Sequence, residues 1–375
     1  MIKKFKISLS ITLSLLFLLT PLMQNVYADN LYINAVSAIA FDCDSKLVLY
    51  EKNAYTPIEI ASTTKIITVL VAIKSGDLNK KIIISEKAAS IRGSEIGLKK
   101  GEEITLKELL YGLMLRSGND AAIAIAEGIS GSVDEFLKLM NEYALEIGLL
   151  NSHFESPHGL DSANHYSTAY DLALVTAKAK EIVLFNDIVG SKDIDAKDYN
   201  FTRSYHNINK ILWTLPNATG VKTGFTGKAG KCLVTSVKIQ NRDVIIVTLN
   251  CTPRWVETEK ISKYVEKNYE YRKLISKEDT LENINIKNNS QNAQIVSKGD
   301  IIIPVKNDEK IVVKIKKPLY EVSAPVHKGE KIGRVEIYAN NKLLYAEALV
   351  AKNSVERENV FRQKLNKIVD FITNK

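Results

Sequence analysis

Three short polar segments, far apart in this 375-residue chain, place the strongest constraint on its fold and chemistry. In chain order they are Ser62-Thr63-Thr64-Lys65, Ser117-Gly118-Asn119 and Lys222-Thr223-Gly224. A serine hydroxyl is a poor nucleophile at neutral pH and needs a base beside it. Two lysines, a second serine and an asparagine are the parts of an acyl-enzyme mechanism that uses no histidine base. The segments therefore predict a serine nucleophile that a lysine activates.

The first segment has helical spacing. Residues three apart lie on one face of a helix, so Ser62 and Lys65 are expected to point the same way. The apolar run 66–73 follows, and Ser-x-x-Lys occurs nowhere else in the chain. A lysine held near other cations and away from water has a lowered pKa and can accept a proton. Lys65 is therefore the predicted general base.

The other two segments occupy different local structures. Ser117-Gly118-Asn119 lies between a helical stretch, 106–115, and an alanine-rich one, 121–126. Lys222-Thr223-Gly224 lies in 218–226, which is typical of a strand with small residues where a ligand backbone must come close. Chance copies of the second motif occur at 162–164 and 290–292, and a variant of the third occurs at 74–76. The order of the three motifs, together with the helical and strand-like stretches around them, favours these three.

The set resembles the three motifs of penicillin-binding proteins and class A β-lactamases. Within that superfamily the chain resembles the low-molecular-mass D-alanyl-D-alanine carboxypeptidases, which are S11-type serine peptidases. Residues 154–161 and 165–173 are similar to the stretch that these carboxypeptidases carry between the second and third motifs. Class A β-lactamases place a deacylating Glu-x-x-x-Asn loop in that interval, and none occurs in the expected place here.

The resemblance implies catalytic roles. Ser62 attacks the carbonyl between the last two D-alanines of a peptidoglycan stem pentapeptide, and Lys65 takes its proton. Ser117 relays a proton to the leaving D-alanine, while Asn119 binds the substrate backbone and orients Lys65. β-Lactams are expected to acylate Ser62, because their strained amide mimics the D-Ala-D-Ala bond. No cofactor is expected.

The resemblance also implies substrate-binding residues. Lys222 sets the local field, and Thr223 and Arg254 bind the terminal carboxylate beside Gly224. The main-chain N–H groups of Ser62 and of a residue near Thr226 are expected to form the oxyanion hole.

The pattern of elements predicts the fold. A strand hairpin is expected over 35–50, helices over 63–147 with a strand-like break at 81–84, and a helix at 169–180. Strands at 220–225, 232–239 and 244–251 and a helix at 257–271 follow. Strands at both ends with helices between them predict an antiparallel sheet flanked by helices. The resemblance implies an α/β (α+β) transpeptidase-like catalytic domain, with a five-stranded sheet and a helical subdomain.

Beyond residue 275 the pattern changes to short alternating strands at 284–287, 311–315, 333–338 and 343–350. These predict a small all-β sandwich over 276–351 without catalytic residues, acting as a spacer or docking platform. The catalytic domain is expected over 29–275. Residues 1–28 have the basic start, apolar middle and small-residue site of a secretory signal peptide. An uncleaved anchor is the alternative.

The last segment, 352–375, is predicted to be an amphipathic helix, with apolar residues at 361, 365, 368 and 372 and a basic polar face. It is expected to lie on an anionic membrane surface. The alternative is a helix packed on the protein's own body. A net charge of +8 and a pI near 9.0 suit work beside anionic lipid and cell-wall polymer. No basic stripe supports nucleic-acid binding. The chain is therefore expected to be exported, either peripheral on the extracytoplasmic face or secreted.

Cysteines and histidines indicate no further chemistry. The three cysteines, Cys43, Cys232 and Cys251, are an odd number in apolar strand-like runs and are expected to be buried free thiols. The five histidines lack metal-ligand spacing. Three other functions stay open for the chain: a serine β-lactamase, a transpeptidase, and a non-catalytic cell-wall-binding relative with a decayed site.

Overall fold

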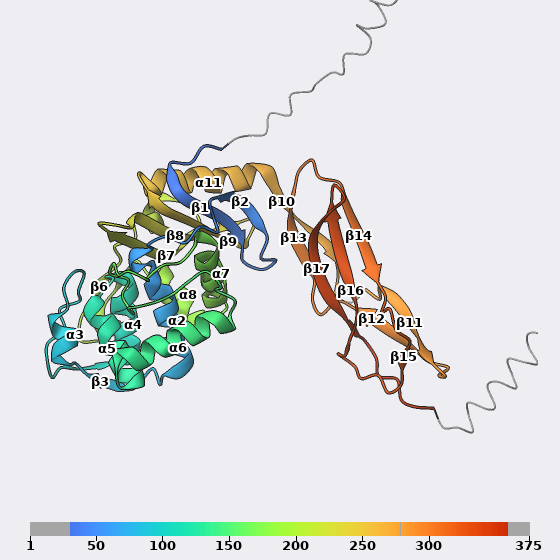
Figure 1. Cartoon of the computed structure of the whole chain (residues 1–375), viewed down its shortest axis with the longest axis horizontal. Helices are drawn as coiled ribbons and strands as arrows, with labels where there is room; N and C mark the ends of the chain where they lie inside the picture. Colours follow the sequence, from blue (N-terminus) through green and yellow to red (C-terminus); the bar gives the residue numbers. More distant parts are fainter. Residues whose placement is uncertain (1–30, 278, 359–375) are drawn as a thin grey trace, which may run out of the picture. The chain divides into compact units, whose positions relative to one another are not determined.

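The computed structural model describes residues 31–277 and 279–358 (Figure 1). A five-stranded antiparallel sheet forms the centre of the first folded part. Its strands are β1 (Ala35–Asp42), β2 (Val48–Lys52), β7 (Ala218–Thr226), β8 (Gly230–Ile239) and β9 (Arg242–Cys251). They lie in the order β2-β1-β9-β8-β7, so the two ends of this sequence region meet at the β1–β9 pair. The predicted five-stranded antiparallel sheet is confirmed, and β7 is one of its edges.

Helices cover both faces of this sheet. In Figure 1, α11 (Arg254–Asn268) lies above it, and α7 (Ala169–Lys180) lies below it and packs on β1 and β9. Because both faces are covered, residues 244–249 are buried without interruption. The same run reads in the sequence as continuous apolar and threonine residues, which is typical of a strand buried on both faces.

The helical subdomain surrounds α2 (Lys65–Ser75), whose residues 65–72 are buried on all sides. A helix that is apolar all round belongs in a core. Its neighbours include α4 (Leu106–Leu115), α5 (Asn119–Ser130) and α6 (Val133–Glu146). The smaller elements are α3 (Glu86–Ser90), α8 (Val183–Gly190), α9 (Ala196–Tyr199), α10 (Ile211–Thr214), and the pairs β3 (Lys81–Ile83) with β4 (Glu103–Thr105) and β5 (Asp193–Ile194) with β6 (Tyr205–His206).

The second folded part is all-β. Strand β10 (Tyr269–Ile275) pairs with β13 (Ile301–Lys306). A six-stranded sheet has the order β14 (Ile311–Lys316), β16 (Lys331–Ala339), β17 (Lys342–Ala351), β12 (Asn292–Val296), β11 (Glu282–Lys287) and β15 (Val322–Ser323). Buried isoleucines and valines from both sheets form its core. The helix expected to reach residue 271 ends at Asn268 instead, because the next seven residues pair with β13.

The predictions for the two chain ends fall largely outside the described residues, namely the signal peptide over 1–28 and most of the C-terminal helix. In the described part of that last segment, 352–358 are not helical, because Val355 is buried and bridges to Val326. Within residues 31–277 and 279–358, no helix is both long and apolar enough to cross a bilayer.

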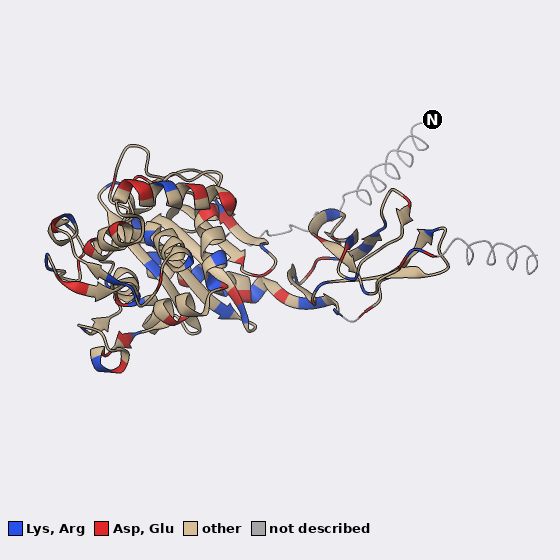
Figure 2. Ribbon diagram, turned by 90° about the horizontal axis from the view of Figure 1, so that it is seen from below, with Lys and Arg blue, Asp and Glu red and all other residues tan. Residues whose placement is uncertain are grey.

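Acidic and basic residues are interspersed over both folded parts of the described chain (Figure 2). The three cysteines are free and buried, as expected. Burial raises the pKa of Cys43 to about 12 and those of Cys232 and Cys251 to about 11, so the thiols stay protonated at neutral pH.

Candidate active site

The first motif lies where a 3₁₀ turn, η1 (Ala61–Thr64), continues into α2. Ser62 is half-buried, Lys65 is fully buried, and Lys65 Nζ lies 2.9 Å from Ser62 Oγ. The predicted pairing of these two residues on one helical face is therefore present. Ala61, just before the serine, has a φ of 51°, in the left-handed region that non-glycine residues seldom occupy. Such strain occurs at functional sites that need a preorganised backbone.

The surroundings of Lys65 favour its neutral form. Burial lowers its pKa well below the ordinary value, and the charge of Lys222 lowers it further. Its Nζ donates to Asn119 Oδ1 at 2.8 Å and to the main-chain oxygen of His158 at 2.7 Å. A neutral amine has two N–H groups and one lone pair. With both N–H groups directed at oxygens, the lone pair faces Ser62 Oγ, as a general base requires.

The second motif lies at the turn between α4 and α5. Ser117 is buried with a φ of 63°, and Asn119 begins α5. Asn119 Nδ2 donates to the main-chain oxygen of Arg92 at 2.9 Å, which directs Oδ1 toward Lys65. The next residue, Asp120, accepts the main-chain N–H groups of residues 96, 97 and 98. These bonds hold the 92–98 loop against the start of α5.

The third motif lies on the edge strand β7. Lys222 is buried, and burial together with the charge of Arg254 lowers its pKa to about 7. A Cβ on Gly224 would lie 3.1 Å from the main-chain nitrogen of Ser62. The small residues of β7 therefore allow the strand to pass directly against the turn that carries Ser62. Thr223 is buried between these two positions.

Arg254 is the first residue of α11 and lies beside the third motif. Its Nη1 donates to the main-chain oxygens of Gly224 at 2.8 Å and Cys232 at 3.0 Å, so it ties α11 to β7 and β8. Burial lowers its pKa. Its Nε is buried and has no hydrogen-bond partner among the described residues.

The segment 154–166 contributes contacts that sequence reasoning did not assign. Besides the His158 oxygen on Lys65, the Pro157 oxygen accepts from Thr68 Oγ1 at 2.7 Å. Gly159 has a φ of 86°, and a Cβ there would lie 2.1 Å from the main-chain oxygen of Ala61. Only glycine fits between this loop and η1. The signal in the sequence is the family-like stretch itself, which by itself predicts no role for an individual residue.

Two side chains of this segment fasten it to the first and third motifs. His165 Nδ1 accepts from the Glu155 N–H at 3.0 Å, so its Nε2–H donates to Thr64 Oγ1 at 2.8 Å. Burial lowers the pKa of His165 to about 4, which keeps it neutral in this role. Asp161 Oδ1 accepts from Thr226 Oγ1 at 2.6 Å, at the end of β7.

The structure thus brings Ser62, Lys65 and Asn119 into direct contact, with Gly224 against Ser62. Arg254 contacts β7, and Ser117 lies two residues before Asn119 in the same turn. Among residues 31–277 and 279–358, no group of three histidine, cysteine or acidic side chains could hold a metal ion.

Comparison with known families assigns both folded parts. Residues 24–252 match the family model described as D-alanyl-D-alanine carboxypeptidase. Residues 269–357 match the model described as penicillin-binding protein 5, C-terminal domain.

Individual proteins give the same result. The chain is 35% identical to D-alanyl-D-alanine carboxypeptidase DacF of Bacillus subtilis over 342 residues, which covers 86% of each protein. It is 30% identical to DacC of Escherichia coli over 384 residues, covering 96% of this chain and 93% of that protein. Penicillin-binding protein 5 of Haemophilus influenzae has a similar structure, with a TM-score of 0.78, 27% identity, and coverage of 87% and 99%.

Proposed function

The chain belongs to the D-alanyl-D-alanine carboxypeptidase family, and from that premise we propose how its residues release the terminal D-alanine of a peptidoglycan stem pentapeptide. The observation that carries the proposal is the buried Lys65 amine, 2.9 Å from Ser62 Oγ and held by two oxygen acceptors.

Acylation begins at Ser62. Its Oγ attacks the carbonyl carbon between the two D-alanines while Lys65 accepts the hydroxyl proton. The contact between Lys65 and Asn119 supports an orienting role for the asparagine. Ser117 then passes a proton to the nitrogen of the departing D-alanine, with Lys222 setting the field. The burial of both Ser117 and Lys222 supports this relay.

The oxyanion hole and the carboxylate site are assigned to β7. The main-chain N–H groups of Ser62 and of a residue just after Gly224, near Thr226, would stabilise the oxyanion. The close approach of Gly224 to the Ser62 nitrogen supports this arrangement. Within the described residues β7 is an edge strand of its sheet, and an extended peptide can add to a sheet edge as a further strand. Thr223 and Arg254 would bind the terminal carboxylate. The unpartnered Arg254 Nε supports that role.

Water then hydrolyses the acyl-enzyme. Glu155, in the loop between the second and third motifs, is the residue to compare with the deacylating glutamate of class A β-lactamases. Its carboxylate accepts hydrogen bonds from the main chain and side chain of Asn164. Its role is therefore to hold the loop, and we assign it none in activating water.

The test of this function is release of free D-alanine from a muramyl pentapeptide by the mature protein. A fluorescent penicillin should also label the wild type covalently, and Ser62→Ala should abolish both reactions while keeping the fold. A stable penicillin adduct on the Ser62→Ala protein would refute the nucleophile.

A transpeptidase is the second candidate, because the chain is 30% identical to a mutant of the Streptomyces K15 DD-transpeptidase, with a TM-score of 0.58 and coverage of 62% and 98%. Adding an acceptor amine to the same assay separates the two reactions. Transfer to the amine in place of hydrolysis would favour the transpeptidase.

The two chain ends are assigned to export and membrane attachment. Residues 1–28 would direct export, and residues 359–375 would hold the protein on an anionic extracytoplasmic membrane surface. The pairing of β10 with β13 supports a domain boundary at the end of α11, slightly before the 275 expected from sequence. Deleting 359–375 should remove co-sedimentation with anionic vesicles and leave carboxypeptidase activity unchanged. Equal sedimentation of both forms would refute the anchor.

A further inference from the structure

Two large apolar side chains stand in water on the loop that joins β14 to β15. Leu319 has a relative exposure of 105% and Tyr320 one of 69%. Leu319 is the most exposed large hydrophobic residue in the described part of the chain. Pro318, just before them, restricts the loop backbone. Adjacent exposed apolar residues of this size favour an interaction surface.

The surroundings of this loop are basic. Residues 310–320 contain four lysines and no acidic residue. Five cationic residues flank the loop against three carboxylates: Lys287, Lys314, Lys316, Lys317 and Arg334, against Glu282, Glu321 and Glu336. The Lys316 and Lys317 side chains are 49% and 58% exposed, so their ion pairs are weak and their ends stay available.

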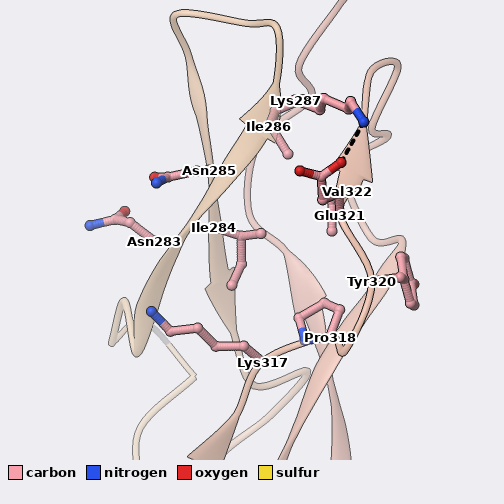
Figure 3. A pocket seen from close by; sticks show the side chains of 10 residues that line it. All are labelled: Asn283, Ile284, Asn285, Ile286, Lys287, Lys317, Pro318, Tyr320, Glu321 and Val322. Carbon is pink, nitrogen blue, oxygen red and sulfur yellow. Dashed lines mark hydrogen bonds and ion pairs between the residues drawn. The ribbon is translucent and has the colours of Figure 1, made fainter.

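Hollows with polar groups lie on two sides of the loop. One, of about 360 Å³, lies between the loop and β11 and includes Asn283, Asn285 and Lys317. In Figure 3 the Lys317 amine extends toward the Asn283 side, whereas Tyr320 points away from it. The other, of about 540 Å³, includes Lys316, Arg334 and Leu319. Leu319 and Tyr320 thus lie between lysine amines and asparagine amides. This arrangement suits contact with a lipid bilayer, which has an apolar interior and anionic headgroups.

The described chain ends at the same edge of this domain. Arg357 Nε donates to the main-chain oxygen of Ala324 at 3.1 Å, next to β15. Asn289 Nδ2, in the turn after β11, donates to the main-chain oxygen of Glu356 at 2.7 Å. The described chain therefore ends beside the β11–β15 edge, which also borders the loop.

We propose that residues 316–320 form a second membrane contact, in which Leu319 and Tyr320 enter the interfacial layer of an anionic bilayer and Lys316 and Lys317 meet lipid phosphates. Lysine stems can lie along the apolar layer while their amines stay at headgroup level. Together with the proposed tail anchor, this contact orients the β-domain on the bilayer. The inference rests on the proposed membrane location and is independent of the catalytic roles.

The test places an environment-sensitive fluorophore on the loop of the full mature chain, through Leu319→Cys. The three native thiols are buried, so labelling is selective for the new cysteine. Vesicles of phosphatidylcholine with about 30% phosphatidylglycerol should raise the emission about twofold or more and shift it to the blue, because the label leaves water. The matched control is Leu150→Cys, 75% exposed on the catalytic domain, whose emission should not change.

Two pairs of substitutions separate the contributions to binding. Leu319→Ser with Tyr320→Ser should weaken vesicle binding of the full chain by about tenfold. Lys316→Glu with Lys317→Glu should weaken binding to anionic vesicles. Both proteins should keep wild-type penicillin labelling and wild-type far-ultraviolet circular dichroism, which together show that the catalytic part and the all-β part fold.

Co-sedimentation without any change in loop emission would overturn the proposal and leave the tail anchor intact. An equal emission change with a soluble glycerol-phosphate polymer would reassign the loop to polymer binding. If the wild-type protein released no D-alanine, the proposed catalytic function would be refuted and the membrane contact would be unaffected.

Discussion

Replacing the buried Lys222 with methionine is expected to stabilise the fold while removing the catalytic charge. The Lys222 pKa falls from 10.5 to about 7, chiefly through burial. Because one pKa unit corresponds to about 1.4 kcal/mol, keeping this lysine inside costs up to about 5 kcal/mol of the free energy of unfolding below pH 7. Methionine fills a similar volume without a charge, so Lys222→Met should recover part of that free energy.

The lowered pKa of Lys222 makes the free energy of unfolding depend on pH. Between about pH 7 and pH 10.5 the unfolded chain holds the Lys222 proton and the folded chain does not, so wild-type stability rises with pH across that window. The methionine variant lacks this dependence. Its advantage should therefore be largest below pH 7 and disappear toward pH 10.5. Removing Lys222 also relieves the repulsion that lowers the Lys65 pKa, which adds to the gain at low pH.

Urea unfolding followed by tryptophan fluorescence measures this difference. Both tryptophans, Trp213 and Trp255, lie outside the all-β part, so the signal reports the catalytic domain. The control is Lys231→Met on the neighbouring strand β8, where the side chain is exposed and no pH-dependent gain is expected. A stability difference between wild type and Lys222→Met that stays constant from about pH 6 to about pH 9.5 would refute the reasoning. Penicillin labelling should be strongly slowed in the same variant.

Three other outcomes are expected. Lys65→Arg should lower the acylation rate by ~10²–10⁴-fold, because arginine cannot give up its proton, and Lys222→Arg should lower it less. Equal losses of acylation rate in stopped-flow measurements would contradict the assignment of Lys65 as the base and of Lys222 as an electrostatic charge. Gly159→Ala should destabilise the fold by about 2 kcal/mol or more and slow acylation, since its Cβ would overlap the Ala61 oxygen; wild-type urea unfolding and kinetics would contradict the tight fit. Penicillin should be hydrolysed slowly and act as an inhibitor, because no glutamate is assigned to deacylation; rapid turnover without D-alanine release would move the protein to the β-lactamases.

Local features of the site followed from the sequence alone. The three-residue spacing of Ser62 and Lys65 predicts a shared helical face, and the two atoms lie 2.9 Å apart. The continuous apolar run of β9 and the small residues of β7 predicted strands, and both form the sheet. These properties depend on near neighbours in the chain, so residue type and period are enough to reveal them. The exception is the end of α11, where pairing of β10 with β13 decided where the helix stops.

The protonation of Lys65 was decided by the tertiary structure. Its two oxygen acceptors come from residues 54 and 93 positions away, and its burial depends on the packing of the whole helical subdomain. One of those acceptors is the main-chain oxygen of His158, a group that every residue type carries. A sequence pattern identifies side chains, whereas a pKa depends on desolvation and on charges brought together by the fold. The sequence therefore identifies the residues that can form and hydrolyse an acyl-enzyme. The folded environment decides whether Lys65 is neutral and can accept a proton.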